Sequence, residues 1–215
     1  MAGSAYLNLY GDKLPAYTGR RGANISSQRV DDLDRLCNMH SARLHIKGRK
    51  KLRTVDLGCG DGIQGLRFSL YGYESYLYDK EALPREILAL RSVYPLVKFK
   101  FRKCDLSDVS NVKLPPNGVD ICYSQRSIHY LDFFTARNLL SKVCDRMSSA
   151  GLLFISASGL SSEIGHAHPD KLKSVEQRYS KLPIKMANNH SIHDEICVYS
   201  SDDLEKLGRQ AGFLP

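Results

Sequence analysis

The sequence lacks the features that mark secreted, disulfide-stapled or membrane-spanning proteins. Its first residues contain no continuous apolar stretch like that of a secretory signal, and no later segment approaches the ~18 apolar residues of a membrane span. Its six cysteines lie far apart and form no CxxC pair. They are Cys37, Cys59, Cys104, Cys122, Cys144 and Cys197. We therefore expect a soluble, cytoplasmic protein without a disulfide framework.

Internal repeats and low-complexity segments are also absent. The 215 residues are 42% hydrophobic and 25% charged, which is enough to bury one core and form one domain. Lysine and arginine number 31 against 23 aspartates and glutamates, which gives a formal net charge of +8. Such a surface attracts anions such as RNA, phosphorylated metabolites or acidic lipid headgroups. This excess of basic residues is equally consistent with a solvated surface that has no nucleic-acid role.

From residue 52 onward, short β-rich runs alternate with helical patterns. The predicted strands are residues 54–57, 75–78, 97–101, 119–123 and 152–156, the helices between them are 63–70, 84–93 and 133–147, and a further helix is expected within 27–46. Five strands alternating with helices predict an α/β fold. We expect a doubly wound, mostly parallel sheet with helices on both faces.

The two flanks of this alternating region differ from it. Residues 1–28 are rich in Gly, Tyr and Arg without clear periodicity, and predict an irregular arm before a single domain at 29–215. Residues 157–195 interrupt the alternation and include a helical pattern at about 171–182. A long excursion at this point is typical of a lid or substrate-binding insertion. The stretch 199–213 then predicts a last helix that ends at Gly212.

The most informative motif is TVDLGCGDG, in which a predicted strand ends at three closely spaced glycines, Gly58, Gly60 and Gly62. Glycines between a strand and a helix permit backbone conformations and a close ligand approach that a Cβ would block. The dinucleotide pattern G-x-G-x-x-G is not met because Ile63 occupies its last position. No Gly-Lys-Ser/Thr follows, which excludes a triphosphate P-loop.

Two acidic residues follow the next two strands. Asp79 ends the second strand and is suited to accept hydrogen bonds from both hydroxyls of a ribose. Asp105 follows the third strand and could accept from an adenine amino group. Because ligands of open α/β sheets bind at the carboxyl ends of the strands, these features predict one nucleoside site.

On these residues, together with the loop DICYSQRSIHYL after the fourth strand, the sequence resembles the class I S-adenosylmethionine-dependent methyltransferases. The resemblance covers about residues 52–156 and extends to the helix in YSSDDLEKLGRQAGF. It implies that S-adenosylmethionine is the cofactor and S-adenosylhomocysteine the product. The cofactor-binding residues implied by the resemblance are Asp56, Gly58, Cys59, Gly60, Asp61, Gly62, Asp79, Lys80, Cys104, Asp105, Leu106, Ser124, Gln125 and Arg126.

The methyl group on a sulfonium is already electrophilic, so such an enzyme mainly aligns a nucleophile with it and removes a proton when the acceptor requires that. His129, just past the fourth strand, is the nearest candidate base, although packing or cofactor lining is the alternative role. The candidate substrate residues are Tyr17, Arg20, Arg21, Tyr130, His166 and His190. The histidines of the insertion lack a spacing diagnostic of structural zinc, so no metal site is predicted.

The acceptor expected from the resemblance is a small metabolite, with anionic metabolites among the candidates, methylated at oxygen or nitrogen. The fourth strand lacks the Asp/Asn-Pro-Pro-aromatic signature of enzymes that methylate exocyclic amines of bases, and no Pro-Cys pair points to cytosine C5. The loop is also similar to that of messenger RNA cap guanine-N7 methyltransferases, which leaves RNA as an alternative acceptor. A third hypothesis is a non-catalytic binding or regulatory subunit that keeps the fold.

The resemblance also predicts an incomplete sheet. Class I enzymes normally add two more strands after the AGF turn, whereas this sequence stops at Pro215. We expect either a truncated product or compensation at the open edge by residues 195–199 or by a partner chain. An uncovered strand edge favours pairing with another molecule, including a second copy of the chain.

Overall fold

The computed structural model describes residues 5–7, 13–15, 32–46, 52–83, 85–94, 97–116 and 118–214. The central strands are β3 (Arg53–Leu57), β4 (Glu74–Asp79), β5 (Phe99–Lys103), β6 (Val119–Gln125) and β7 (Met147–Ser156). The main helices are α2 (Asp32–Ile46), α3 (Ile63–Leu70), α4 (Arg85–Val93), α5 (Phe133–Cys144) and α8 (Ser201–Gln210). The shorter elements are β1 (Ala5–Leu7), β2 (Lys13–Pro15), η1 (Val109–Asn111), η2 (Ile128–Tyr130), α6 (Glu163–Ala167), η3 (Val175–Gln177), β8 (Tyr179–Lys181), α7 (Ile184–His190) and β9 (Glu195–Cys197).

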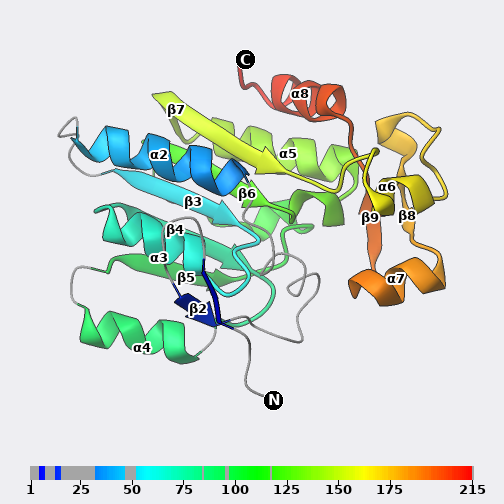
Figure 1. The fold of residues 1–215 in the computed structure, drawn as a ribbon. Helices are drawn as coiled ribbons and strands as arrows, with labels where there is room; N and C mark the ends of the chain where they lie inside the picture. The colour runs from blue at the N-terminus through cyan, green and yellow to red at the C-terminus, as the bar shows by residue number, and fades with distance from the viewer. Residues whose placement is uncertain are drawn as a thin grey trace.

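The five central strands form one sheet in the order β5-β4-β3-β6-β7, and every neighbouring pair is parallel. The predicted α/β class and its five strands are therefore confirmed. The chain winds outward from β3 in both directions, first through β4 to β5 and then through β6 to β7 (Figure 1). The strand order reverses beside β3, and such a switch point opens a crevice at the carboxyl ends of the strands.

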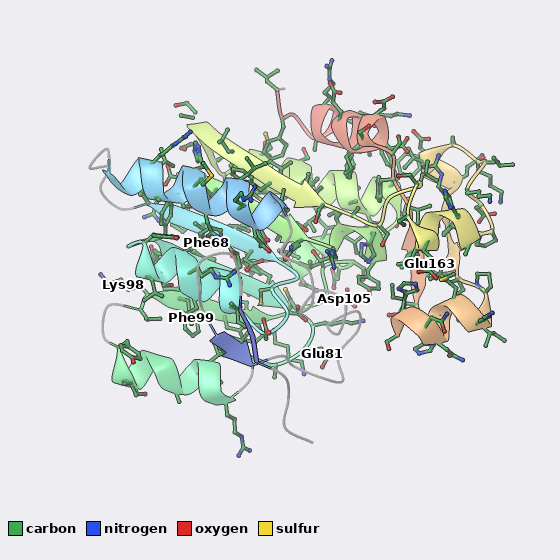
Figure 2. The ribbon with its side chains drawn as sticks, in the orientation of Figure 1. Phe68, Glu81, Lys98, Phe99, Asp105 and Glu163 are labelled. Carbon is green, nitrogen blue, oxygen red and sulfur yellow. The ribbon has the colours of Figure 1, made fainter. Side chains whose placement is uncertain are left out.

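Helices cover both faces of the sheet, as predicted (Figure 1). On the face of α2, α3 and α4, Phe68 packs edge-on against Tyr123 of β6 with ring centroids 5.9 Å apart. Phe99 of β5 is buried in a neighbouring cluster on this side, and Figure 2 labels both phenylalanines. On the opposite face, α5 and α8 pack buried residues such as Leu139 and Leu207 against the sheet. The sheet is thus sealed on both faces, and its strand ends are left for a site.

The helix ends follow ordinary capping rules. Asp132 precedes α5 and accepts hydrogen bonds from the backbone N–H groups of Phe134 and Thr135, each at 3.0 Å. Ser200 and Asp203 form a capping box at the start of α8. α5 ends at Cys144, three residues before the predicted end, because Met147 already begins β7.

The insertion at 157–195 differs from the prediction in one element. The helix expected at about 171–182 is wrong: this stretch holds the short η3 and the strand β8. Arg178 explains the difference, since its guanidinium donates to the Lys173 carbonyl at 3.1 and 2.7 Å and to the Val198 carbonyl at 2.9 Å. These contacts hold the backbone in a turn that directs Tyr179 into β8.

The strand expected at the open sheet edge pairs elsewhere. β9 pairs antiparallel with β8, so the expectation that 195–199 covers β7 is wrong for this strand. Tyr199, which follows β9, bonds instead to the segment just after β7. Its backbone N–H donates to the Ser158 carbonyl at 2.9 Å, and its carbonyl accepts from the N–H of Leu160 at 2.8 Å. In the described part of the chain, no strand pairs with the outer edge of β7.

The N-terminal arm predicted to be irregular contains β1 and β2, which pair antiparallel with each other, so the prediction is wrong for these two segments. All six cysteines are free thiols. Among the helices that the structure describes, none is both long and apolar enough to cross a membrane.

Candidate functional site

The turn between β3 and α3 contains the three glycines of the sequence motif, and each has a positive φ. The angles are +72° at Gly58, +56° at Gly60 and +80° at Gly62. L-residues with a side chain rarely adopt this left-handed region, so the turn requires glycine. The backbone N–H groups of Gly58 and Cys59 both donate to the carbonyl of Tyr78, at 2.8 and 3.0 Å. The turn is therefore held against the end of β4.

Asp79 at the end of β4 links directly to this turn. Its Oδ2 accepts a hydrogen bond from the backbone N–H of Gly60 at 2.7 Å, and its Oδ1 accepts from the N–H of Glu81 at 2.9 Å. Each carboxylate oxygen can accept more than one hydrogen bond, so Asp79 keeps acceptor capacity for a ligand. The structure thus brings together Gly60 and Asp79, which the sequence analysis places at the ends of successive strands.

Asp56, the acidic residue of the motif, lies beneath the turn and is only 2% exposed. Its pKa is raised well above the usual value, first by burial and then by the nearby carboxylates of Asp79, Asp34 and Asp61. Its Oδ2 is buried without a hydrogen-bond partner. The region beneath the glycine turn therefore carries negative charge, and an ionised Asp56 is unfavourable there.

The loop after β6 packs against the glycine turn. Ser127 donates from its hydroxyl to the carbonyl of Leu57 at 2.5 Å and lies 2.7 Å from the hydroxyl of Ser124. A Cβ on Gly58 would lie 2.2 Å from the Ser127 Cβ, so a side chain at Gly58 would collide with this loop. Arg126 has a φ of +50°, which is uncommon for a residue with a side chain. Backbone strain of this kind concentrates at functional sites.

Asp34 in the first turn of α2 is a site residue that sequence reasoning missed. Its carboxylate accepts hydrogen bonds from the hydroxyl of Tyr123 and, at 3.1 Å, from the side-chain amide nitrogen of Gln125. Because an ionised carboxylate only accepts, the NH₂ group of Gln125 faces Asp34 and its carbonyl oxygen faces away. In the sequence, Asp34 is marked only by its position at the start of a predicted helix. That position does not reveal a contact with residues about 90 positions later.

His129 lies in η2 and is almost fully buried, at 3% exposure. Its Nδ1 accepts a hydrogen bond from the backbone N–H of Ser158 at 3.3 Å. Burial, with a smaller contribution from the positive charge of Arg126, lowers its pKa to about 3. A neutral imidazole that accepts at Nδ1 carries its proton on Nε2, and this atom is buried without a hydrogen-bond partner. His129 is therefore arranged as a neutral donor.

The loop after β5 carries the predicted adenine contacts. The N–H of Cys104 donates to the carbonyl of Asp79 at 2.9 Å, which joins this loop to the end of β4. Asp105 is exposed, and its Oδ1 accepts from the N–H and the hydroxyl of Ser107 at 2.9 and 2.7 Å, while Leu106 is buried. Figure 2 shows Asp105 and Glu81 at the end of the sheet toward which the strands point.

Besides the contact of Ser158 with His129, two further contacts join the insertion to this end of the sheet. Tyr179 of β8 donates from its hydroxyl to the carbonyl of Tyr130 at 3.1 Å, and Lys80 lies 3.9 Å from Asp194, just before β9. His166 and His190 lie farther out, on α6 and α7. His190 lies 3.3 Å from Glu163, and among the described residues no hydrogen bond or ion pair joins either histidine to the glycine turn.

Other predicted features fall outside these contacts. Tyr17, Arg20 and Arg21 lie outside the described residues. In the ranges that the structure does describe, no group of three or more His, Cys, Asp or Glu side chains is placed to hold a metal ion.

Comparisons with known proteins identify the fold. No family model matches the sequence, and no curated protein matches it as a relative. Among solved structures, the 1,6-didemethyltoxoflavin-N1-methyltransferase of Burkholderia thailandensis, with S-adenosylhomocysteine bound, is similar with a TM-score of 0.54 and 16% identity, over 81% of this chain and 66% of that protein. The mitomycin 7-O-methyltransferase MmcR is similar with a TM-score of 0.53 and 12% identity, over 89% of this chain and 50% of that protein.

An O-methyltransferase family protein from B. thailandensis is similar with a TM-score of 0.52 and 15% identity, over 84% of this chain and 51% of that one. The present chain thus spans about half to two thirds of the length of these structures. The sheet order, the helices on both faces and these similarities show that the chain has the class I methyltransferase fold.

Proposed function

We propose that the protein is an S-adenosylmethionine-dependent methyltransferase that acts on a small molecule. The observation that supports this most strongly is the contact between Gly60 and Asp79 on a class I methyltransferase fold. It joins a glycine turn, which a ligand can approach closely, to a carboxylate suited to ribose hydroxyls. Calorimetry with S-adenosylhomocysteine tests the proposal, and a folded protein that fails to bind at millimolar ligand would overturn it.

The residues present fit such a cofactor. A Cβ on Gly60 would meet no atom within 4 Å among the described residues, so the backbone there borders open space. Asp79 retains acceptor capacity beside this space, and Asp105 stands at the end of the neighbouring strand. Gly58 to Gly62 would hold the amino-acid and ribose parts, Asp79 the ribose hydroxyls, and Asp105 with its neighbours the adenine. The bound cofactor would supply an electrophilic methyl group on a sulfonium.

The chain's own residues would then position the acceptor and exclude water. Ser124 and Ser127 fix the loop after β6 against the end of β3, and Asp34 fixes the amide of Gln125. Holding a nucleophile in line with a reactive centre can supply much of the rate enhancement. The Tyr179 contact to Tyr130 joins the insertion to this loop, which supports a role for 157–195 in covering the acceptor.

The sequence favours His129 as a base, but its geometry favours another role. A pKa of about 3 makes it a weak proton acceptor near neutral pH, and its Nδ1 is already engaged. We propose that His129 acts as a neutral packing residue that fixes the loop after β6 through its Nδ1 contact to Ser158. An acceptor such as an amine or an acidic hydroxyl would then lose its proton to water or to a carboxylate.

The acceptor itself is proposed as a class only. A compound small enough to be enclosed between the loop after β6 and the insertion is favoured, with anionic metabolites among the candidates because of the net charge of +8. RNA remains an alternative prediction on the similarity of the stretch that contains Gln125, His129 and Tyr130. Transfer of a labelled methyl group in a cell extract distinguishes these acceptors, and its absence would favour the non-catalytic subunit.

A further inference from the structure

A surface cavity of about 620 Å³ opens at the carboxyl end of β5. Its lining residues are Arg102, Lys103, Cys104, Asp105, Asp108, Asn111 and Lys113. The volume lies within the range of small-molecule sites. The glycines of the turn, Asp79 and Lys80 do not line it. The cavity therefore adjoins the proposed cofactor site through Asp105 but lies outside the glycine turn.

Three cations line this cavity and have no hydrogen-bond or ion-pair partner among the residues that the structure describes. Within the described ranges, the structure shows no hydrogen bond or ion pair from the side chains of Arg102, Lys103 and Lys113. Elsewhere on the sheet surface, Lys100 of the same strand pairs with Glu74 at 2.6 Å. The three lining cations are exposed and can bind a ligand without first breaking a salt bridge.

The two carboxylates of the cavity are instead engaged by their own loop. Asp105 accepts from the N–H and hydroxyl of Ser107. Asp108 accepts from the Ser110 hydroxyl and the Asn111 amide, each at 2.6 Å, and these bonds lower its pKa. Their charges are thus partly satisfied by local donors, whereas no described residue accepts a hydrogen bond from the side chains of the three cations.

Packing brings two of the cations to one place. Arg102 is paired in parallel register with Tyr78 of β4, and the hydroxyl of Tyr78 donates to the backbone carbonyl of Lys113 at 2.9 Å. This contact holds the loop after η1 beside the end of β5. Behind the loop, the ammonium of Lys142 donates to the carbonyls of Val109 at 2.8 Å and Ser110 at 3.2 Å. The positive wall of the cavity is therefore anchored to the sheet and to α5.

We propose that this cavity binds a phosphate-bearing small molecule, with Arg102 and Lys113 on its phosphoryl oxygens. Arginine offers a planar fork and lysine a compact charge, and both are common partners of phosphate. The volume of this surface cavity matches that of a small molecule rather than that of an extended polyanion. The cavity shares Cys104 and Asp105 with the proposed cofactor site, but S-adenosylmethionine carries no phosphate for Arg102 and Lys113 to bind.

Calorimetry with inorganic pyrophosphate on the full chain tests this proposal. Wild-type protein should bind, and Arg102→Ala and Lys113→Ala should each raise the Kd about tenfold, as expected for the loss of one charge-assisted contact. Lys185→Ala, which removes an exposed lysine on α7, is the matched control and should leave the Kd unchanged. Circular dichroism of each variant establishes that it is folded.

Saturating S-adenosylhomocysteine should leave the pyrophosphate Kd unchanged, and its own binding should persist in both variants. No pyrophosphate binding by the folded wild type would overturn the proposal, as would an equal loss in the Lys185 variant. Displacement of pyrophosphate by S-adenosylhomocysteine would assign the cavity to the cofactor site. A single-stranded RNA that binds more tightly than pyrophosphate through Arg102 and Lys113 would overturn the assignment to a small molecule.

Discussion

The carboxylate of Asp79 lies 2.7 Å from the backbone nitrogen of Gly60, and this hydrogen bond joins the end of β4 to the glycine turn after β3. The contact places an acidic group at the edge of a backbone segment that a ligand can approach. Neither residue alone would define a nucleoside site. Together they define where the ribose is proposed to lie, so variants at this turn are informative.

Two glycine substitutions in the turn should have different consequences. Gly60→Ala should cost only the strain of a left-handed alanine, about 1–2 kcal/mol, but should weaken S-adenosylhomocysteine binding because its methyl group enters the open space. Gly58→Ala adds a collision with Ser127 and should lose more stability. Urea unfolding and calorimetry separate the two effects. Equal losses of stability would contradict the packing described for the loop after β6.

Asp34 should stabilise the junction of α2 and β6. Tyr123 is only 2% exposed, and Asp34→Ala leaves its hydroxyl without an acceptor. The substitution should therefore lower the free energy of unfolding by about 1–3 kcal/mol. Tyr123→Phe removes the donor instead, and the double variant should be less destabilised than the sum of the single ones. Urea unfolding of the four proteins provides the measurement. Strict additivity would show that the pair is not coupled.

His129 should make the protein sensitive to acid. Its pKa is about 3 when folded and near 6.5 when unfolded, so the unfolded state binds more protons between these values. The free energy of unfolding should therefore decrease as the pH falls below about 6.5, by up to about 1.4 kcal/mol per pH unit from this group. His129→Gln should flatten this dependence. His166→Gln, at an exposed position, should retain the wild-type slope, and identical slopes in all three proteins would contradict the burial of His129.

Arg178 should hold the insertion together. The residue is only 6% exposed. Its guanidinium donates to two backbone carbonyls and pairs with Asp203 at 2.7 Å. Arg178→Met should cost about 3–5 kcal/mol locally because it leaves a carboxylate and carbonyls without partners. Lys206→Met removes a more exposed pair with Glu176 and should cost about 0–1 kcal/mol. Faster amide exchange over residues 163–199 in the first variant only is the expected result, and similar exchange in both would contradict it.

The sheet could be predicted from the sequence because each of its strands has a local signal. The apolar runs, the glycine turn after β3 and the acidic residues after β4 and β5 are all encoded within a few neighbouring positions. Their order then fixes a parallel sheet, since right-handed crossovers leave few alternatives. The candidate site could be placed for the same reason, because Gly60 and Asp79 both stand at carboxyl ends of adjacent strands.

The remaining features depend on contacts between distant residues. The pattern at 171–182 does not form a helix because Arg178 holds this stretch in a turn, and its partners Val198 and Asp203 lie 20 and 25 positions later. Asp34 could not be assigned to the site because its partner Gln125 is 91 positions away. The burial that lowers the pKa of His129 likewise depends on contacts of η2 with distant parts of the chain, such as Ser158 and β9, which no local pattern records.

The central claim is that the glycine turn and Asp79 form a site for S-adenosylmethionine, and titration of the folded protein with S-adenosylhomocysteine in a calorimeter tests it most directly. We expect binding by the wild type and a Kd about 10- to 100-fold higher for Asp79→Ala, which loses one or two charge-assisted hydrogen bonds. Asp145→Ala, at an exposed position after α5, should bind as the wild type does. A folded wild-type protein that shows no binding at millimolar S-adenosylhomocysteine would contradict the claim, and an unchanged Kd in Asp79→Ala would show that the ribose lies elsewhere.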